Sequence, residues 1–240
     1  MVVENFLQFY FLRIRFRKSI NLTKIDIVDL PQIVPIFPLS GVLLLPHGRL
    51  PLNIFETRYL QMIEDVMSSH RMIGMVQPKN PMDKCNRPNI YPVGCIGKIT
   101  SFSETEDNRY QISLKGIIRF IATDEMSYDS LLYRRVRVKY DSFSSDLSEQ
   151  RLIVLDRKNL FPVLKSFFDS QGISANWEAI NESDDADLLT NLAMICPFNP
   201  NEKQALLECK TSKAMADTLV SLIDMARHES SMNKYSSNSH

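Results

Sequence analysis

The sequence has few of the residues that build nucleotide-binding loops, metal clusters or disulfide frameworks. Its 240 residues include seven glycines, four cysteines and four histidines, and neither GxxxxGK[ST] nor GxSxG occurs. The cysteines form no CxxC pair, and no histidine lies near a cysteine at ligand spacing, so we predict no metal site and no cofactor. Cysteines used in this way are typical of reduced thiols in a cytoplasmic protein.

Net charge is also lacking, because 28 basic residues balance 28 acidic ones. Such a chain has no overall field that would attract nucleic acid or an anionic membrane. The uncharged run at residues 5–12 is far shorter than the roughly 20 residues that a membrane span needs. Positive charge follows this run, whereas a secretory signal has its charge first. We therefore expect no membrane span and no nucleic-acid partner.

Residues 1–30 carry no recognisable domain pattern, and three interpretations of them stay open. They are translated from an upstream start that the working protein does not use, or they form a membrane-surface anchor, or they are a loosely ordered extension. We treat 1–30 as an N-terminal extension that is poorly ordered or not part of the domain.

Residues 31–141 have the pattern of a β-rich subdomain. Short apolar runs are punctuated by prolines, which lack the amide hydrogen that a central strand donates, so short, interrupted or edge strands are expected. Apolar and polar side chains alternate over 109–115, and the preceding Asp107 and Asn108 suit a hairpin turn because they tolerate positive φ. One amphipathic helix is predicted at about 56–69.

Residues 142–228 follow as a helical subdomain, and 229–240 are predicted to be a disordered tail. The clearest helix start is Asn199-Pro200-Asn201-Glu202, which has the composition of a capping box with proline in the first turn. A longer helix is expected at 149–171, with Pro162 splitting or kinking it. Strands followed by helices make the fold class α+β.

Side chains that carry chemistry elsewhere have structural interpretations here. Two acidic groups lie at a hairpin tip and in a first helical turn, where solvation and the helix dipole explain them: Glu104, Glu106 and Asp107, and Asp184, Asp185 and Asp187. Three cysteines lie beside apolar neighbours and are interpreted as buried hydrophobes, whereas Cys85 is left without a role: Cys95, Cys196 and Cys209. A row of basic residues is interpreted as a solvated sheet face rather than an RNA-binding face: Arg109, Lys115, Arg119, Arg135, Arg137 and Lys139.

Three stretches in this order resemble the Lon protease N-terminal, or substrate-binding, domain family. The first is PIFPL at 35–39 with IFETRY at 54–59. The second is VGCIGKI at 93–99 with LKGIIRF at 114–120. The third is LAMICPF at 192–198 followed by EKQALLE at 202–208. Together they span about residues 33 to 227.

The resemblance implies a PUA-like β-rich pseudo-barrel followed by a C-terminal helical bundle, and a role in binding unfolded or tagged protein clients. We interpret the chain as a stand-alone, non-catalytic form of this family, without its ATPase and Ser–Lys peptidase, and therefore not as an enzyme. Its expected partners are protein clients and, in one version of the hypothesis, a separate Lon-type protease.

The binding of unfolded chains requires exposed apolar surface. The substrate-binding side chains that we predict are Phe55, Tyr59, Phe102 and Tyr110. The residues assigned to structural motifs are Glu56 and Arg58, as an ion pair at the start of the helix, and Gly94, Gly97 and Gly116, as turns, bulges or close backbone approaches.

Two other functions stay open at this point. One is an RNA- or small-ligand-binding domain, by analogy with PUA-like relatives, and fold analogy is weak support for a function. The other is a hydrolase with a cysteine or serine nucleophile assembled from residues distant in sequence.

Overall fold

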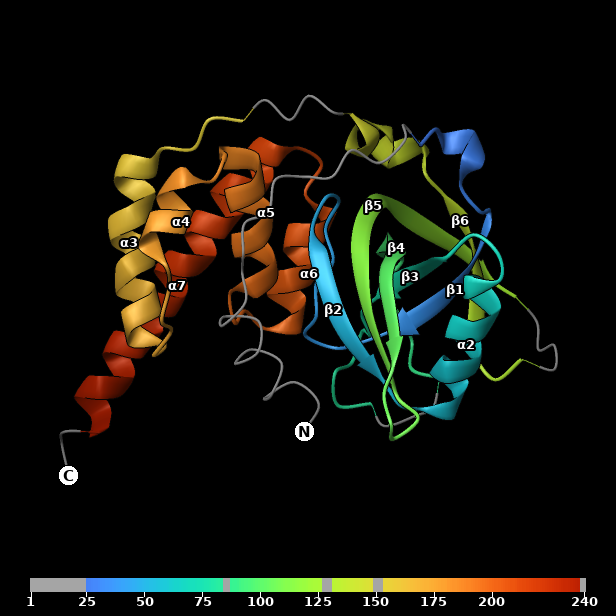
Figure 1. Ribbon diagram of the computed structural model, residues 1–240. Helices are drawn as coiled ribbons and strands as arrows, with labels where there is room; N and C mark the ends of the chain where they lie inside the picture. Colours follow the sequence, from blue (N-terminus) through green and yellow to red (C-terminus); the bar gives the residue numbers. More distant parts are fainter. Residues whose placement is uncertain (1–24, 84–86, 127–130, 149–152, 238–240) are drawn as a thin grey trace. The chain divides into compact units, whose positions relative to one another are not determined.

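The computed structural model describes residues 25–83, 87–126, 131–148 and 153–237. Backbone contacts divide the chain into a β-rich unit within Asn21–Gln150 and a helical unit within Arg151–His240 (Figure 1). Strands come first and helices second, so the α+β fold class expected from the sequence is confirmed.

The β-rich unit is one mixed sheet with a single long helix. Its elements are η1 (Ile27–Asp29), β1 (Ile33–Pro38), β2 (Arg49–Ile54), α2 (Thr57–Met67), β3 (Met72–Val76), β4 (Val93–Glu104), β5 (Tyr110–Glu125), β6 (Arg134–Lys139) and η2 (Asp141–Leu147). The strand order is β2-β5-β4-β3-β1-β6, and the C-terminal part of β5 also pairs with β6. This second pairing curls the sheet into the pseudo-barrel.

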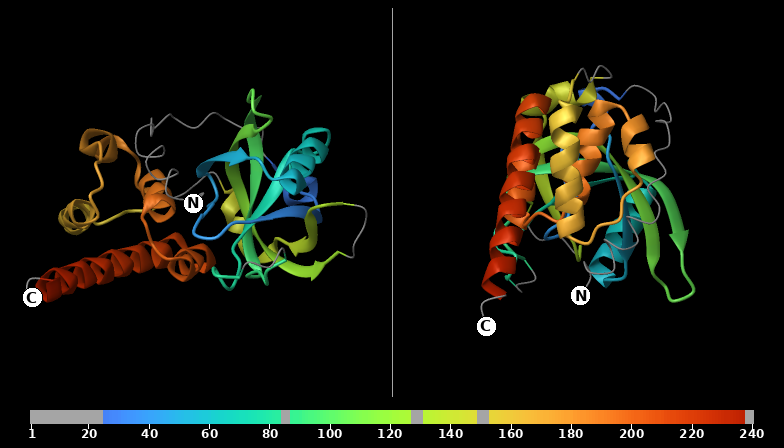
Figure 2. Two further views of the ribbon diagram at one scale, coloured as in Figure 1. Left: turned by 90° about the horizontal axis from the view of Figure 1, so that it is seen from below. Right: turned by 90° about the vertical axis from the view of Figure 1, so that its left-hand side faces the viewer.

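Proline lies in two of the four short strands, β1 and β2, whereas β3 and β6 contain none. Pro51 lies in β2, a six-residue strand at the end of the strand order. The long β4 and β5 contain no proline, and they form the hairpin whose turn we placed at Asp107 and Asn108. Asn108 has φ of +56°, as expected for a short polar side chain in such a turn. The end of this hairpin extends past the neighbouring strands (Figure 2).

Helix α2 buries the face that its sequence predicts. Tyr59, Met62, Ile63 and Val66 are all buried, and they recur at three- and four-residue spacing. The opposite face of the helix carries Glu64 and Asp65, both exposed.

The β-rich unit extends beyond the predicted limits of 31 and 141. Leu30 is buried in the main apolar cluster, and Ile25 and Ile27 pack against it. At the other end, Phe143 of η2 is buried in the same cluster. The division between the units therefore falls after Gln150 rather than at 141, because η2 contributes apolar area to the core of the strands.

The helical unit contains α3 (Arg157–Ser170), α4 (Trp177–Glu182), α5 (Asp185–Ile195), α6 (Pro200–Glu208) and α7 (Ser212–Ser237). The capping box predicted for α6 is present, because Asn199 Oδ1 accepts from the Glu202 amide and Glu202 accepts from the Asn199 amide. Helix α3 starts at Arg157, later than the predicted 149, because the side chain of Asp156 caps it there.

Two further helical segments differ from the sequence predictions. Helix α4, capped by Asn176, is too short to show a clear periodicity and was not predicted. Helix α7 continues to Ser237, whereas residues 229–240 are predicted from the sequence to be a disordered tail (Figure 2). Residues 229–237 contain no glycine or proline, and adding residues to a helix that already exists costs little compared with nucleating one.

No helix in the described part of the chain has the length and apolar character needed to cross a membrane.

Candidate functional site

Two of the predicted binding side chains form an exposed aromatic pair on the β4–β5 hairpin. The rings of Phe102 and Tyr110 lie 5.0 Å apart between centroids and are tilted by 57°. Phe102 is 42 % exposed although it is a large apolar residue, and Tyr110 is partly exposed. Tilted rings at this distance attract each other, which holds the pair in place while leaving apolar surface in contact with water. We call Phe102 and Tyr110 the aromatic pair.

Helix α2 fixes the orientation of the aromatic pair. The hydroxyl of Tyr110 donates a hydrogen bond of 2.8 Å to Glu64 Oε1 on the exposed face of that helix. This hydrogen bond, followed by desolvation and the negative charges of Glu64 and Glu104, raises the pKa of the Tyr110 phenol. The phenol is therefore held in its protonated form beside two carboxylates.

Phe55 is a further exposed aromatic residue of this region. It directly follows β2 and is 45 % exposed. Its ring lies 5.7 Å from the guanidinium carbon of Arg109, which in turn pairs with Asp107 at 2.7 Å. Phe55 is thus an exposed aromatic residue beside Arg109, the residue that precedes β5.

Tyr59 belongs to the core rather than to the exposed surface. It is 5 % exposed, and its ring packs 4.2 Å from that of Phe37. Burial is the main cause that raises the pKa of its phenol. The apolar periodicity of α2 marks Tyr59 as core, and this is the signal that separates it from the three exposed aromatic residues.

The start of α2 is held by the predicted ion pair. Arg58 Nη2 lies 2.7 Å from Glu56 Oε2, and the same guanidinium group lies over the ring of Tyr59 at 4.6 Å. Glu56 occupies the N-cap position, but its side chain makes no capping hydrogen bond. The pair lies at the junction between β2 and α2, beside the ring of the adjacent Tyr59.

The three motif glycines are positions of close approach within the β-rich unit. A Cβ atom on Gly94 would lie 2.5 Å from the ring of Phe120, and one on Gly97 would lie 2.8 Å from Leu44. At Gly116 the same atom would lie 1.9 Å from the backbone oxygen of Leu45. These contacts shape the core and leave no room for side chains.

A buried ion pair that the sequence patterns did not indicate joins η2 to β5. Arg119 is 4 % exposed, and its Nε and Nη2 atoms donate to Asp146 at 2.8 Å and 2.7 Å, while its backbone amide donates at 3.0 Å. The guanidinium group also lies 4.4 Å from the centre of the Phe143 ring. We had placed Arg119 in the row of basic residues on a solvated face, which is wrong.

Lys115, also predicted to belong to the solvated row of basic residues, is only 8 % exposed, so that prediction is wrong for it too. Lys115 pairs in regular register with Lys98 of β4 and Arg49 of β2 and is nevertheless buried. On β6 the alternation holds, because Val136 and Val138 are buried while Arg137 and Lys139 are exposed. The row is therefore not one continuous basic face.

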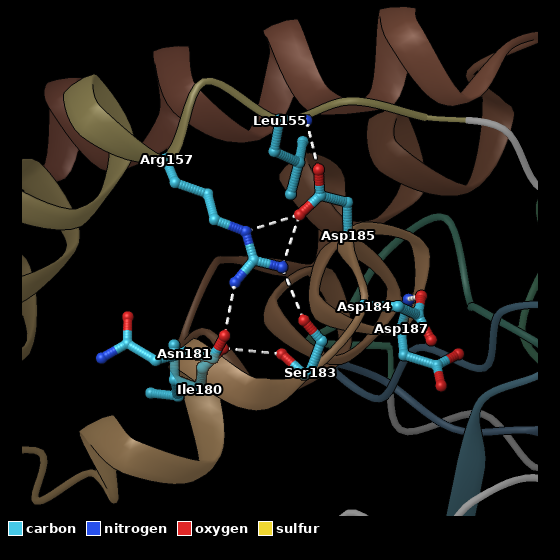
Figure 3. Close-up of polar contacts among 8 residues, drawn as sticks. All are labelled: Leu155, Arg157, Ile180, Asn181, Ser183, Asp184, Asp185 and Asp187. Carbon is cyan, nitrogen blue, oxygen red and sulfur yellow. Dashed lines mark hydrogen bonds and ion pairs between the residues drawn. The ribbon is translucent and has the colours of Figure 1, made fainter.

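The acidic residues at the start of α5 have structural partners (Figure 3). Asp184 caps the helix by accepting from the Asp187 amide at 2.8 Å. Asp185 accepts from Arg157 Nε at 2.6 Å and from the Leu155 amide at 2.7 Å. Desolvation opposes ionisation of Asp185, but these hydrogen bonds outweigh it and lower the pKa of the carboxyl group.

Arg157 uses the rest of its guanidinium group to close the turn between α4 and α5. Its Nη1 donates to the Asn181 carbonyl at 2.9 Å and its Nη2 to the Ser183 carbonyl at 2.5 Å (Figure 3). One arginine thus joins the first turn of α3 to the residues that precede α5. We interpret these contacts of Arg157 and Asp185 as structural rather than catalytic.

Two of the four cysteines are deeply buried thiols. Cys95 and Cys196 have no measurable exposure, and burial raises the pKa of both, to about 12 for Cys196. A thiol with such a pKa is protonated near pH 7 and is a poor nucleophile. Cys209 is partly exposed and lies within 3.3 Å of the Ala205 carbonyl oxygen, while Cys85 lies outside the described residues.

Lys203 of α6 is a buried cation. It is 5 % exposed, and its Nζ atom donates to the Met194 carbonyl at 3.2 Å. Burial lowers the pKa of its ammonium group to about 8 from 10.5. The unfolded chain therefore binds this proton more tightly than the folded chain between pH 8 and 10.5, and the free energy of unfolding should rise with pH in that window.

We predict that Lys203→Met removes this pH dependence. Relative to Lys203→Met, the wild-type chain should gain about 2 kcal/mol between pH 7 and 9.5, since one pKa unit corresponds to about 1.4 kcal/mol. The buried thiols, whose raised pKa lowers stability as the pH rises, act equally in both proteins. Urea unfolding followed by circular dichroism from pH 7 to 9.5 measures this gain, below the range where tyrosines of the unfolded chain ionise. Lys213→Met, at an exposed lysine, is the matched control and should keep the wild-type slope. Equal slopes for both variants would contradict the prediction.

The comparisons with known proteins agree with this architecture. The family model for the ATP-dependent protease La (LON) substrate-binding domain matches residues 33–225. The chain is 24 % identical over 180 residues to a Lon protease of Dictyoglomus thermophilum and 26 % identical over 189 residues to one of Syntrophus aciditrophicus. These matches cover 75 % and 76 % of this chain but 23 % and 24 % of those proteins, so the chain spans about a quarter of the length of these relatives.

Two solved structures share the fold. A Lon N-terminal domain protein from Xanthomonas campestris aligns with a TM-score of 0.54 at 18 % identity, over 78 % of this chain and 96 % of that one. The N-terminal domain of a Lon protease from the Mycobacterium avium complex aligns with a TM-score of 0.55 at 15 % identity, over 80 % and 98 % of the two chains. At these identities the likeness supports the fold.

Proposed function

The chain belongs to the LON substrate-binding domain family, and from this membership we propose that it binds unfolded or tagged protein clients without altering them. The observation that carries the proposal is the exposed aromatic pair, Phe102 and Tyr110, on the projecting hairpin. Exposed apolar side chains at one place are the physical requirement for capturing unfolded chains. Phe55 supplies further apolar surface nearby.

The geometry supports binding more than chemistry. The buried thiols are protonated near pH 7. At the start of α5, Asp184 caps the helix and Asp185 binds Arg157. The basic residues that an RNA-binding face would need include two that are buried, Lys115 and Arg119. We propose that the chain acts in proteolysis or quality control as a recognition module, with a Lon-type protease as one partner that would receive its clients.

We predict that Phe102→Ala/Tyr110→Ala lowers the affinity for a permanently unfolded model protein about tenfold. Each exposed ring that becomes buried in a complex contributes roughly 1 kcal/mol or less, so the two together account for about one order of magnitude. Fluorescence anisotropy with the labelled unfolded protein measures the dissociation constant. Near-wild-type stability in urea should show that the variant is folded.

The matched control is Met82→Ala, which removes another exposed apolar side chain of the same unit, 80 % exposed. It should leave the affinity unchanged. If the folded wild-type protein binds no unfolded chain, or if it cleaves one, the proposed function is refuted.

A further inference from the structure

The aromatic pair lies beside two exposed carboxylates. Glu104 faces Tyr110 across the β4–β5 pairing and is two residues from Phe102 on the same strand, so the three side chains share one face. Glu64 accepts the hydrogen bond of the Tyr110 hydroxyl at 2.8 Å. Both carboxylates are exposed at the edge of the rings.

The guanidinium groups of this region are already neutralised by carboxylates of their own. Arg109 pairs with Asp107 at 2.7 Å, and Arg58 pairs with Glu56 at 2.7 Å. In the described part of the chain, Glu64 and Glu104 have no such ion pair. The surface around the aromatic pair therefore carries net negative charge. The hydrogen bond to Glu64 is the largest cause of the raised pKa of the Tyr110 phenol, and the charges of Glu64 and Glu104 add to it.

We propose that the aromatic pair with Glu64 and Glu104 selects client segments in which lysine or arginine accompanies apolar residues. The proposal rests on the proposed function and names the class of client that this surface fits. An ammonium or guanidinium group is attracted to the face of an aromatic ring, and its aliphatic stem covers apolar surface. The carboxylates beside the rings then accept hydrogen bonds from the charged end.

Charge complementarity excludes the opposite class of segment. An apolar segment that carries glutamate or aspartate would place like charges beside Glu64 and Glu104, and juxtaposed like charges suppress binding. A neutral apolar segment would make the contact with the rings but would lack the charge-assisted hydrogen bonds to the carboxylates. The surface should therefore rank segments as basic, then neutral, then acidic.

Three labelled peptides test this ranking with the full-length chain. They share length and apolar residues, and they differ only in carrying lysine, glutamine or glutamate at two positions. Anisotropy at 50 mM salt should give an affinity for the lysine peptide about tenfold above that of the glutamine peptide, because two exposed charge contacts are each worth a few-fold. Raising the salt to 500 mM should remove most of this difference.

The variant Glu64→Gln/Glu104→Gln keeps an acceptor for the Tyr110 hydroxyl and removes both charges. It should bind the lysine peptide only as well as it binds the glutamine peptide. The control Glu106→Gln removes one exposed charge at the tip of the same hairpin and should keep most of the preference.

Each other outcome has a distinct meaning. Equal affinity of the wild-type protein for the lysine and glutamine peptides would overturn the charge selection and leave the proposed function standing. A preference that survives in Glu64→Gln/Glu104→Gln would overturn the assignment to this site. A folded wild-type protein that binds none of the three peptides, nor an unfolded protein, would overturn both.

Discussion

Gly116→Ala should destabilise the β-rich unit by about 4 kcal/mol or more. An added Cβ would lie 1.9 Å from the backbone oxygen of Leu45, far inside van der Waals contact. Two backbone hydrogen bonds hold this approach in place, from the His47 amide to the Gly116 carbonyl at 2.8 Å and from the Gly116 amide to the Gly48 carbonyl at 2.9 Å. Relief of the overlap must therefore move backbone, which costs more than the usual 1–3 kcal/mol of an overpacked core.

The measurement is urea or thermal unfolding, with soluble yield as a second readout if the variant does not fold. Gly41→Ala is the control for the loss of a glycine in the same unit. Gly41 has φ of +74°, so alanine there is strained by about 1 kcal/mol, but an added Cβ has no atom within 4 Å. If the Gly116→Ala protein were as stable as Gly41→Ala, the backbone at Leu45 would be able to move away at little energetic cost, contrary to the prediction.

Local patterns predicted the parts of this fold that depend on a few consecutive residues. The buried face of α2 follows from the spacing of Tyr59, Met62, Ile63 and Val66. The capping box of α6 follows from Asn199 and Glu202, which satisfy each other's backbone amides. Such features need no knowledge of what lies across the core.

Features that depend on tertiary contacts were not predictable in this way. The sequence pattern of its strand predicts that Arg119 is exposed to solvent. In the structure Arg119 is buried and forms an ion pair with Asp146, 27 residues later. Lys115 keeps the alternating phase of its strand and is nevertheless buried, which only the folded structure shows. A single sequence without these pairings cannot distinguish such residues from a solvated basic face.

The candidate surface shows the same limit. Phe55, Tyr59, Phe102 and Tyr110 are all aromatic, and helix periodicity separates Tyr59 from the others as a core residue. Nothing in the sequence indicates that Tyr110 would contact Glu64, because the two residues are 46 positions apart. The charged surroundings of the aromatic pair became apparent only from the packing of α2 beside the hairpin.

Asp146→Ala should destabilise the β-rich unit by about 3–5 kcal/mol. The change leaves Arg119 buried without its carboxylate, and the loss of one partner of a buried ion pair is costly because the remaining charge is uncompensated. It also removes the acceptor of the Arg119 amide, and with it a contact that holds η2 and the buried Phe143 against β5. Urea unfolding should show the loss as a lower midpoint.

The double variant Arg119→Met/Asp146→Leu should recover most of this stability, because two apolar side chains replace both charges and no buried charge stays unpaired. Arg109→Ala breaks an exposed pair of the same unit, with side chains 48 % and 58 % exposed, and should leave the stability close to that of the wild-type protein. Because the pair Arg119–Asp146 ties η2 to the strands, Asp146→Ala should also make the peptide bonds of Asp141–Leu147 more accessible to protease. A double variant as unstable as Asp146→Ala would mean that the specific hydrogen bonds, rather than the buried charge, hold η2 in place.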